Sequence, residues 1–167
     1  MNKKNIKLGE INKQNYEQVQ KIYQQGIDTR NASFQKNALD FKSFDSKYLE
    51  ACRLVAFDER KREVVGWAAL LPVSAMESYC GVAELSLYVA EAARGCGVGK
   101  FLMEELIQVS EKAGFWTLQS LIFPENEGSL ALHHAFGFKT LCIHEKLGKM
   151  DGVFRDVARL ERRSSKF

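Results

Sequence analysis

The feature that most constrains the fold is a glycine-rich hexapeptide at residues 94–99, Arg-Gly-Cys-Gly-Val-Gly. It follows an apolar run at 83–89 with the character of a strand and precedes a run at 100–107 with the character of a helix. Backbone N–H groups at a helix start lack intrahelical partners, and the helix dipole favours negative charge there. Glycine leaves the backbone open to a phosphate, and Arg94 adds a forked cation. The segment therefore predicts an anion-binding loop, with a plain glycine-rich turn as the alternative.

Spacing separates the anion-binding loops that share this position. A P-loop needs a glycine five residues before a Gly-Lys-Ser/Thr triplet. Here Gly99 and Lys100 are followed by Phe101, and position 94 is arginine. A dinucleotide-binding fingerprint needs a third glycine where Lys100 stands. What remains is Arg-x-x-Gly-x-Gly, from Arg94 through Gly97 to Gly99. That pattern resembles the pyrophosphate loop of the GNAT superfamily of N-acetyltransferases, which bind acetyl-CoA.

Hydrophobic periodicity and turn residues predict the order β-α-α-β-β-β-α-β-α-β-β along the chain. Strands are expected at 6–10, 53–57, 64–70, 82–89, 117–122, 138–146 and 153–161. Helices are expected at about 15–30, 43–52, 98–112 and 126–136, with Asn12 capping the first. The 167 residues, 46% of them hydrophobic, fit one domain with a full core. This predicts a single N-acetyltransferase domain over 1–167, of the α/β (α+β) class, with a mixed, mostly antiparallel sheet and helices on both faces.

Four further segments resemble one GNAT branch, the phosphinothricin and methionine sulfoximine acetyltransferases: 29–34, 82–89, 126–138 and 153–157. The resemblance implies a GNAT fold in which the 82–89 strand splays from its neighbour beyond Tyr88. It implies acetyl-CoA as co-substrate, with no metal. The implied acetyl-CoA contacts are Leu87, Tyr88, Val89, Arg94, Gly95, Cys96, Gly97, Val98, Gly99, Asn126 and Ser129. Helix capping is the alternative role for Asn126.

Catalysis needs a group that removes the proton of the acceptor amine. Glu84 aligns with the base proposed for the family and shares a strand face with Ser86 and Tyr88. Its alternative role is a solvated strand glutamate. His133 aligns with a histidine given a catalytic role in the family, and a packed helix histidine is equally expected. No cysteine lies on the strand with Glu84, which favours direct attack of the amine on the thioester.

The acceptor end departs from the family pattern. Phe34, Tyr79 and Phe154 are candidate walls of the acceptor pocket, although core packing would explain each of them. The family often has arginine near the position of Met76, but no arginine or lysine lies between Arg62 and Arg94. We therefore expect methionine sulfoximine or methionine sulfone to be a better acceptor than phosphinothricin, whose second acidic group would lack a partner.

Composition and net charge argue against nucleic acid and membranes as partners. The net charge is +3, from 24 basic and 21 acidic residues, and does not favour nucleic acid. No apolar run approaches a membrane span and the N-terminus lacks a signal-peptide core, so we expect a cytoplasmic protein. The four cysteines are expected to be reduced and mostly buried. The family resemblance also implies a homodimer. Alternative functions are a non-catalytic acetyl-CoA-binding regulatory domain and a protein N-terminal or lysine acetyltransferase.

Overall fold

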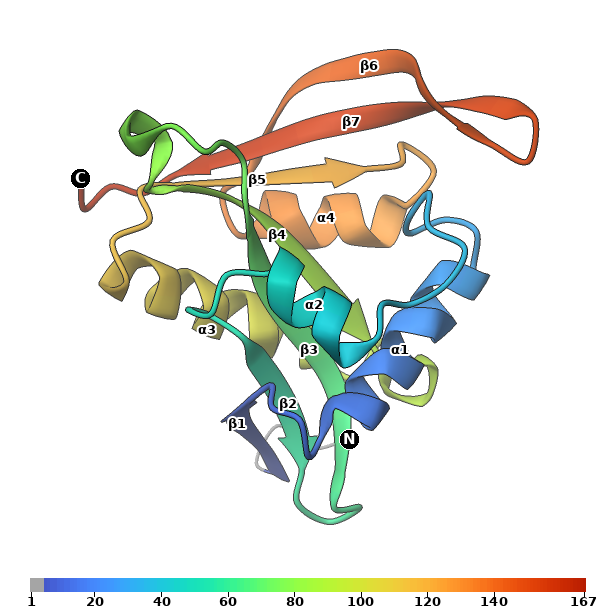
Figure 1. Cartoon of the computed structure of the whole chain (residues 1–167), viewed down its shortest axis with the longest axis vertical. Helices are drawn as coiled ribbons and strands as arrows, with labels where there is room; N and C mark the ends of the chain where they lie inside the picture. Colours follow the sequence, from blue (N-terminus) through green and yellow to red (C-terminus); the bar gives the residue numbers. More distant parts are fainter. Residues whose placement is uncertain (1–4) are drawn as a thin grey trace.

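A single seven-stranded sheet organises the chain (Figure 1). The structure is a computed structural model that describes residues 5–167. The strand order is β1-β2-β3-β4-β5-β7-β6, and every neighbouring pair is antiparallel except β4 and β5. The strands are β1 (Ile6–Glu10), β2 (Leu54–Asp58), β3 (Glu63–Pro72), β4 (Val82–Val89), β5 (Thr117–Ile122), β6 (Lys139–Met150) and β7 (Val153–Arg163). The predicted element order and the mixed, mostly antiparallel sheet are confirmed.

Helices cover both faces of the sheet, as the sequence predicts. They are α1 (Tyr16–Asp28), α2 (Phe41–Lys47), α3 (Val98–Lys112) and α4 (Glu127–Ala135), with 3-10 turns at Glu77–Tyr79 and Glu91–Ala93. On one face, α1 and α2 pack around the buried Trp67 of β3. On the other, the apolar side of α3 covers Ala68 and Leu70, and α4 packs against the same core. No helix within residues 5–167 is long and apolar enough to span a membrane.

The sheet splits between β4 and β5. These strands start side by side, and their pairing covers Val82 to Glu84 of β4 only. Beyond that point β4 stays paired with β3 as far as Val89, whereas β5 turns toward β7 (Figure 1). The splay therefore begins after Glu84, four residues earlier than the position expected from the family resemblance. It leaves one backbone edge of residues 85–89 without a strand partner.

Three local predictions were wrong. The second helix begins at Phe41, because Asp40 caps it by accepting a hydrogen bond from Ser43 N at 2.7 Å, and it ends at Lys47. The first helix has Asn15 as its N-cap residue, and Asn12 instead closes the preceding turn. Two of the cysteines expected to be buried, Cys80 and Cys142, are exposed because they lie in a loop and on an edge strand.

Candidate active site

Two cavities meet where β4 separates from β5. The first, of about 410 Å³, lies on the side of α2, and the second, of about 440 Å³, extends toward the start of α3. Both are lined by Leu87 and Tyr88 of β4, and by Asn126 and Ser129 at the start of α4. Ala32, in the loop after α1, also lines both. The unpaired stretch of β4 thus forms a wall that runs from one cavity into the other.

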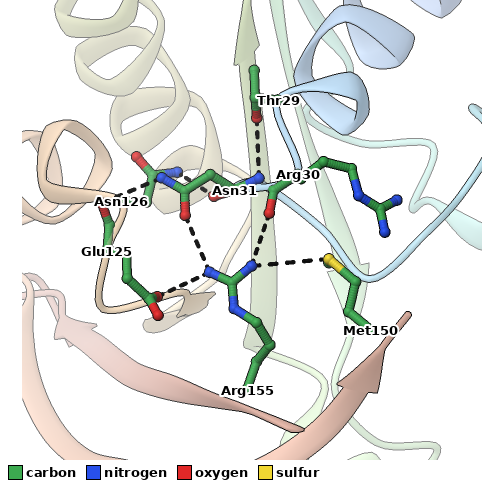
Figure 2. A network of polar contacts seen from close by, with 7 residues as sticks. All are labelled: Thr29, Arg30, Asn31, Glu125, Asn126, Met150 and Arg155. Atoms are coloured by element: carbon green, nitrogen blue, oxygen red, sulfur yellow. Dashed lines mark hydrogen bonds and ion pairs between the residues drawn. The ribbon is translucent and has the colours of Figure 1, made fainter. Parts of the chain in front are cut away.

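A polar network joins the loop after α1 to the loop after β5 and to β7 (Figure 2). Arg155 of β7 donates to Arg30 O at 2.8 Å, to Asn31 Oδ1 at 3.4 Å and to Glu125 Oε2 at 3.0 Å. Its guanidinium carbon lies 4.1 Å from the centre of the Phe123 ring. Together these contacts hold three segments that are far apart in the sequence: the loop after α1, the loop after β5, and β7.

Glu84 lines the first cavity, together with Ser86 and Tyr88 from the same strand face. It is the last residue of β4 that pairs with β5, opposite Gln119, and it also pairs with Leu71 of β3. Burial raises the pKa of the Glu84 carboxyl, and the charges of Lys47 and Arg159 partly offset this effect. A partly buried carboxylate with a raised pKa is a stronger base than one in water.

Hydroxyl groups and aromatic rings surround Glu84. Tyr48 Oη donates to Ser86 Oγ at 3.0 Å, and Tyr23 Oη donates to Gln35 Oε1 at 2.6 Å. The Tyr88 ring stacks on Trp67 with centroids 4.9 Å apart. Burial raises the pKa of the Tyr88 hydroxyl, which keeps it protonated at neutral pH. The cavity wall therefore offers neutral hydroxyl groups around one carboxylate.

His133 lies on the buried side of α4 and is 3% exposed. Its Nδ1 donates to Ser129 O at 2.7 Å, since a carbonyl oxygen only accepts, and its Nε2 accepts from Ser120 Oγ at 3.0 Å. Burial lowers the pKa of the imidazole, so the ring is neutral at pH 7. Both ring nitrogens are engaged within the protein, which favours the packed-histidine alternative over proton transfer.

The glycine-rich segment forms the mouth of the second cavity. Arg94, Gly95 and Gly99 line it, and Gly97 is the N-cap of α3 with φ of +85°. The first helical hydrogen bond runs from Phe101 N to Gly97 O, so the N–H groups of residues 98–100 precede it and lack intrahelical acceptors. A Cβ atom at Gly95 would meet no atom within 4 Å outside the adjacent residues, which makes this an open cradle rather than a packed turn.

Three of the residues expected to contact acetyl-CoA either have a second structural role or do not present their side chain to the second cavity. Asn126 caps α4, because its Oδ1 accepts from Ser129 N at 3.2 Å, so the capping alternative is confirmed. Its Nδ2 also donates to Asn31 O at 2.9 Å, which leaves one amide N–H for a ligand. The Val98 side chain is buried in the core, and Cys96 is not among the residues that line the cavity. At Val98 only the backbone remains a candidate for binding, whereas the Cys96 N–H already donates to Ala93 O at 3.3 Å.

Most candidate acceptor residues lie outside the first cavity. Phe34 lines it and packs edge-on against Phe123, with centroids 4.8 Å apart. The side chains of the other three are exposed: Met76 by 62%, Tyr79 by 48% and Phe154 by 58%. None of them is among the residues of the described chain, 5–167, that line this cavity. Lys47 at the end of α2 does line it. The sequence did not indicate this residue, because the family's basic position corresponds to the segment before β4.

Comparison with known proteins gives the family. Residues 16–138 match the Acetyltransferase (GNAT) family. The chain belongs to the GNAT acetyltransferases. It is 32% identical over 108 residues to a phosphinothricin N-acetyltransferase of Streptomyces coelicolor, a match that covers 65% of this chain and 63% of that protein. It is 24% identical over 140 residues to an L-methionine sulfoximine/L-methionine sulfone acetyltransferase of Pseudomonas paraeruginosa, covering 81% of each.

A solved GNAT structure supports the same placement. A phosphinothricin acetyltransferase from Sinorhizobium meliloti, in complex with acetyl-CoA, superposes with a TM-score of 0.84 at 25% identity, covering 95% of this chain and 88% of that one. The chain is an acetyl-CoA-dependent N-acetyltransferase of the GNAT family, similar to the phosphinothricin acetyltransferases.

Proposed function

We propose that this GNAT protein transfers the acetyl group of acetyl-CoA to the primary amine of a small, amino-acid-like acceptor of the methionine sulfoximine, methionine sulfone or phosphinothricin type. The observation that carries the proposal is the position of Glu84. Its carboxyl lies in the first cavity, three to four residues along β4 from Leu87 and Tyr88, which both cavities share. An acceptor in the first cavity would have its amine between this carboxylate and the thioester.

The second cavity suits acetyl-CoA. The open backbone at Gly95, the unpaired N–H groups of residues 98–100 and the side chain of Arg94 form a cradle for a pyrophosphate. The unpartnered edge of residues 87–89 and the remaining N–H of Asn126 would hold the pantetheine arm, and Ser129 lies beside them. When bound, acetyl-CoA supplies an activated acetyl thioester.

In the proposed mechanism Glu84 removes a proton from the acceptor ammonium, directly or through one water, and the neutral amine attacks the thioester carbonyl. A backbone N–H near Tyr88 stabilises the developing oxyanion, which is worth roughly 3–4 kcal/mol in acyl transfer. His133 holds Ser129 and Ser120 in place through its two ring nitrogens and takes no proton.

The charge of the first cavity supports a preference among acceptors. Among the described residues that line it there is one lysine and no arginine. A sulfone or sulfoximine end is uncharged, whereas phosphinothricin carries a phosphinate in addition to its α-carboxylate, and a single lysine can meet only one of these two anions. We expect methionine sulfone and methionine sulfoximine to exceed phosphinothricin in kcat/KM by at least about tenfold.

The activity is tested by following free thiol release from acetyl-CoA with a panel of amines. Release with methionine sulfone and sulfoximine, and little with peptides, is the expected result. Release with peptide N-termini or lysines alone would replace the proposal by a protein acetyltransferase. Calorimetric binding of acetyl-CoA without release for any amine would replace it by a non-catalytic binding domain.

We also propose that the protein forms a homodimer through the β6–β7 hairpin. This hairpin ends the sheet, and several of its large apolar side chains are about half exposed or more: Leu141, Ile143, Leu147, Val153 and Phe154. Leu147 also lines the first cavity, so a second subunit on the hairpin would border the acceptor. Sedimentation that shows only a 19.0 kDa species at micromolar concentration would reject the dimer.

A further inference from the structure

The first cavity contains an unpaired cation. Lys47 is the last residue of α2, it is exposed, and it is the one Lys or Arg among the described residues that line this cavity. Among residues 5–167, no carboxylate lies within ion-pair distance, 4.0 Å, of its ammonium. The nearest recorded partner is the ring of Tyr48, with Nζ 5.9 Å from the centroid. The ammonium is therefore available to a ligand.

Lys47 and Glu84 face the same cavity with opposite charges. They are close enough for the Lys47 charge to act on the Glu84 carboxyl, yet they form no ion pair within 4.0 Å. An α-amino acid carries an ammonium and a carboxylate on one carbon atom. A zwitterion of this kind placed between the two side chains would meet a complementary charge at each end.

The other cations near the cavity are engaged elsewhere. Arg159 also acts on Glu84, but it donates to Gln119 Oε1 at 2.8 Å and does not line the cavity. Lys149 lies over the Phe154 ring, with Nζ 5.3 Å from the centroid, and is likewise absent from the lining. Lys47 is thus the side chain best placed to bind an anionic group of the acceptor.

We propose that Lys47 is a specificity-determining residue that binds the carboxylate of an α-amino-acid acceptor while Glu84 faces its amine. This inference rests on the proposed function and narrows its acceptor class to α-amino acids with a free carboxylate. The lysine would reach the acceptor from α2, whereas the loop before β4 does not line the cavity in the described part of the chain.

The test compares methionine sulfone with 3-(methylsulfonyl)propylamine, the same molecule without its carboxylate. In Lys47→Met, kcat/KM for methionine sulfone falls about tenfold or more, as expected for the loss of a charge-assisted hydrogen bond, while kcat/KM for the amine changes less than about twofold. Any effect of Lys47 on the basicity of Glu84 applies to both acceptors and cancels in their ratio. Lys47→Arg retains most of the preference for methionine sulfone over 3-(methylsulfonyl)propylamine.

Lys42→Met is the matched control, because Lys42 lies on the same helix, is exposed and does not line the cavity. It leaves the ratio of the two acceptors unchanged. An unchanged ratio in Lys47→Met, in a wild-type protein that acetylates both compounds, overturns the Lys47 assignment and leaves the proposed function intact.

A binding measurement distinguishes failure of the proposed function from failure of the Lys47 assignment. If the wild type releases no thiol with either acceptor, the proposed function falls. Calorimetric titration of methionine sulfone into the CoA-bound protein then decides on Lys47. Binding that Lys47→Met weakens tenfold and Lys42→Met does not would support a carboxylate site without transfer. Binding that is absent, or equal in all three proteins, overturns the assignment.

Discussion

Replacing Arg155 by methionine should lower both stability and substrate affinity. The side chain is 18% exposed and lies over the buried Phe123 ring, so methionine retains the apolar contact and removes only the charge and the donors. The lost contacts are the bond to Arg30 O, the weak bond to Asn31 Oδ1, the ion pair with Glu125 and the cation–π contact with Phe123.

The magnitude follows from the contacts. The charge-assisted bond to the Arg30 carbonyl is worth about 1.5 kcal/mol. The cation–π contact adds about 1 kcal/mol. The ion pair adds only about 0.5 kcal/mol, because the Glu125 side chain is 60% exposed. The sum, about 3 kcal/mol, corresponds to a fall in Tm of roughly 6–12 °C for a chain of this size.

Thermal unfolding measured by circular dichroism tests this estimate, with Arg163→Met as control. Arg163 lies on the same strand, but its one recorded side-chain bond is a 3.5 Å contact with the exposed C-terminal residue. The control should change Tm by less than about 2 °C. A fall of less than 2 °C in Arg155→Met as well would show that the network does not hold the loop.

The same variant has a kinetic consequence. Asn31 is bonded to both Arg155 and Asn126, and the loop that carries it borders both cavities. Release of this loop should raise KM for acetyl-CoA and for the acceptor together, since both ligands would lose a wall. An Arg155→Met protein with reduced Tm and unchanged KM values would assign the network to stability alone.

Three further outcomes are expected. Glu84→Gln should lower turnover at pH 7 by roughly 10²-fold. Its rate should recover as pH rises and the amine loses its proton unaided, whereas the wild type should lose activity as pH falls through the raised pKa of Glu84. Arg94→Gln should weaken CoA binding by calorimetry, more at low salt than at high salt, and leave acetyl-pantetheine turnover unchanged. Hydrogen bonds from Lys166, Ser164 and Arg162 hold the pKa of Glu111 at about 2. Its stabilising contribution is therefore full above the ordinary value of 4.5 and is lost as pH falls toward 2, so the Tm values of wild type and Glu111→Gln should differ at pH 6 and converge only as pH approaches 2.

The elements could be predicted from the sequence because local signals set them. Alternating and helical apolar spacing gave the strands and helices in their order, and Pro72 and Gly114 lie where elements end. The bounds of α2 were missed because an aspartate cap at position 40 outweighed the polar turn character of 31–41.

The contacts that assemble the site could not be predicted in this way. Arg155 and Arg30 are 125 residues apart, and nothing in either local sequence indicates the other. The split of the sheet depends on how two strands pair, and β4 alone does not show where β5 leaves it. Lys47 was missed for a related reason, since it comes from the short helix α2 rather than from the segment next to Glu84.

The register of β4 is consistent with the proposed role of Glu84 as the base. Pairing with Leu71 on one side and Gln119 on the other fixes its backbone, because it is the last residue of the strand held from both sides. The next residue, Leu85, has its side chain in the apolar core. A one-residue slip in the register of β4 would therefore bury the carboxylate in that core without a partner. Beyond Glu84 the strand is no longer paired with β5, and at residues 87–89 it lines the second cavity. The point where the sheet splits therefore supplies both a rigid, partly buried carboxylate and, within a few residues, unpaired backbone groups, which is the combination that acyl transfer to an amine requires.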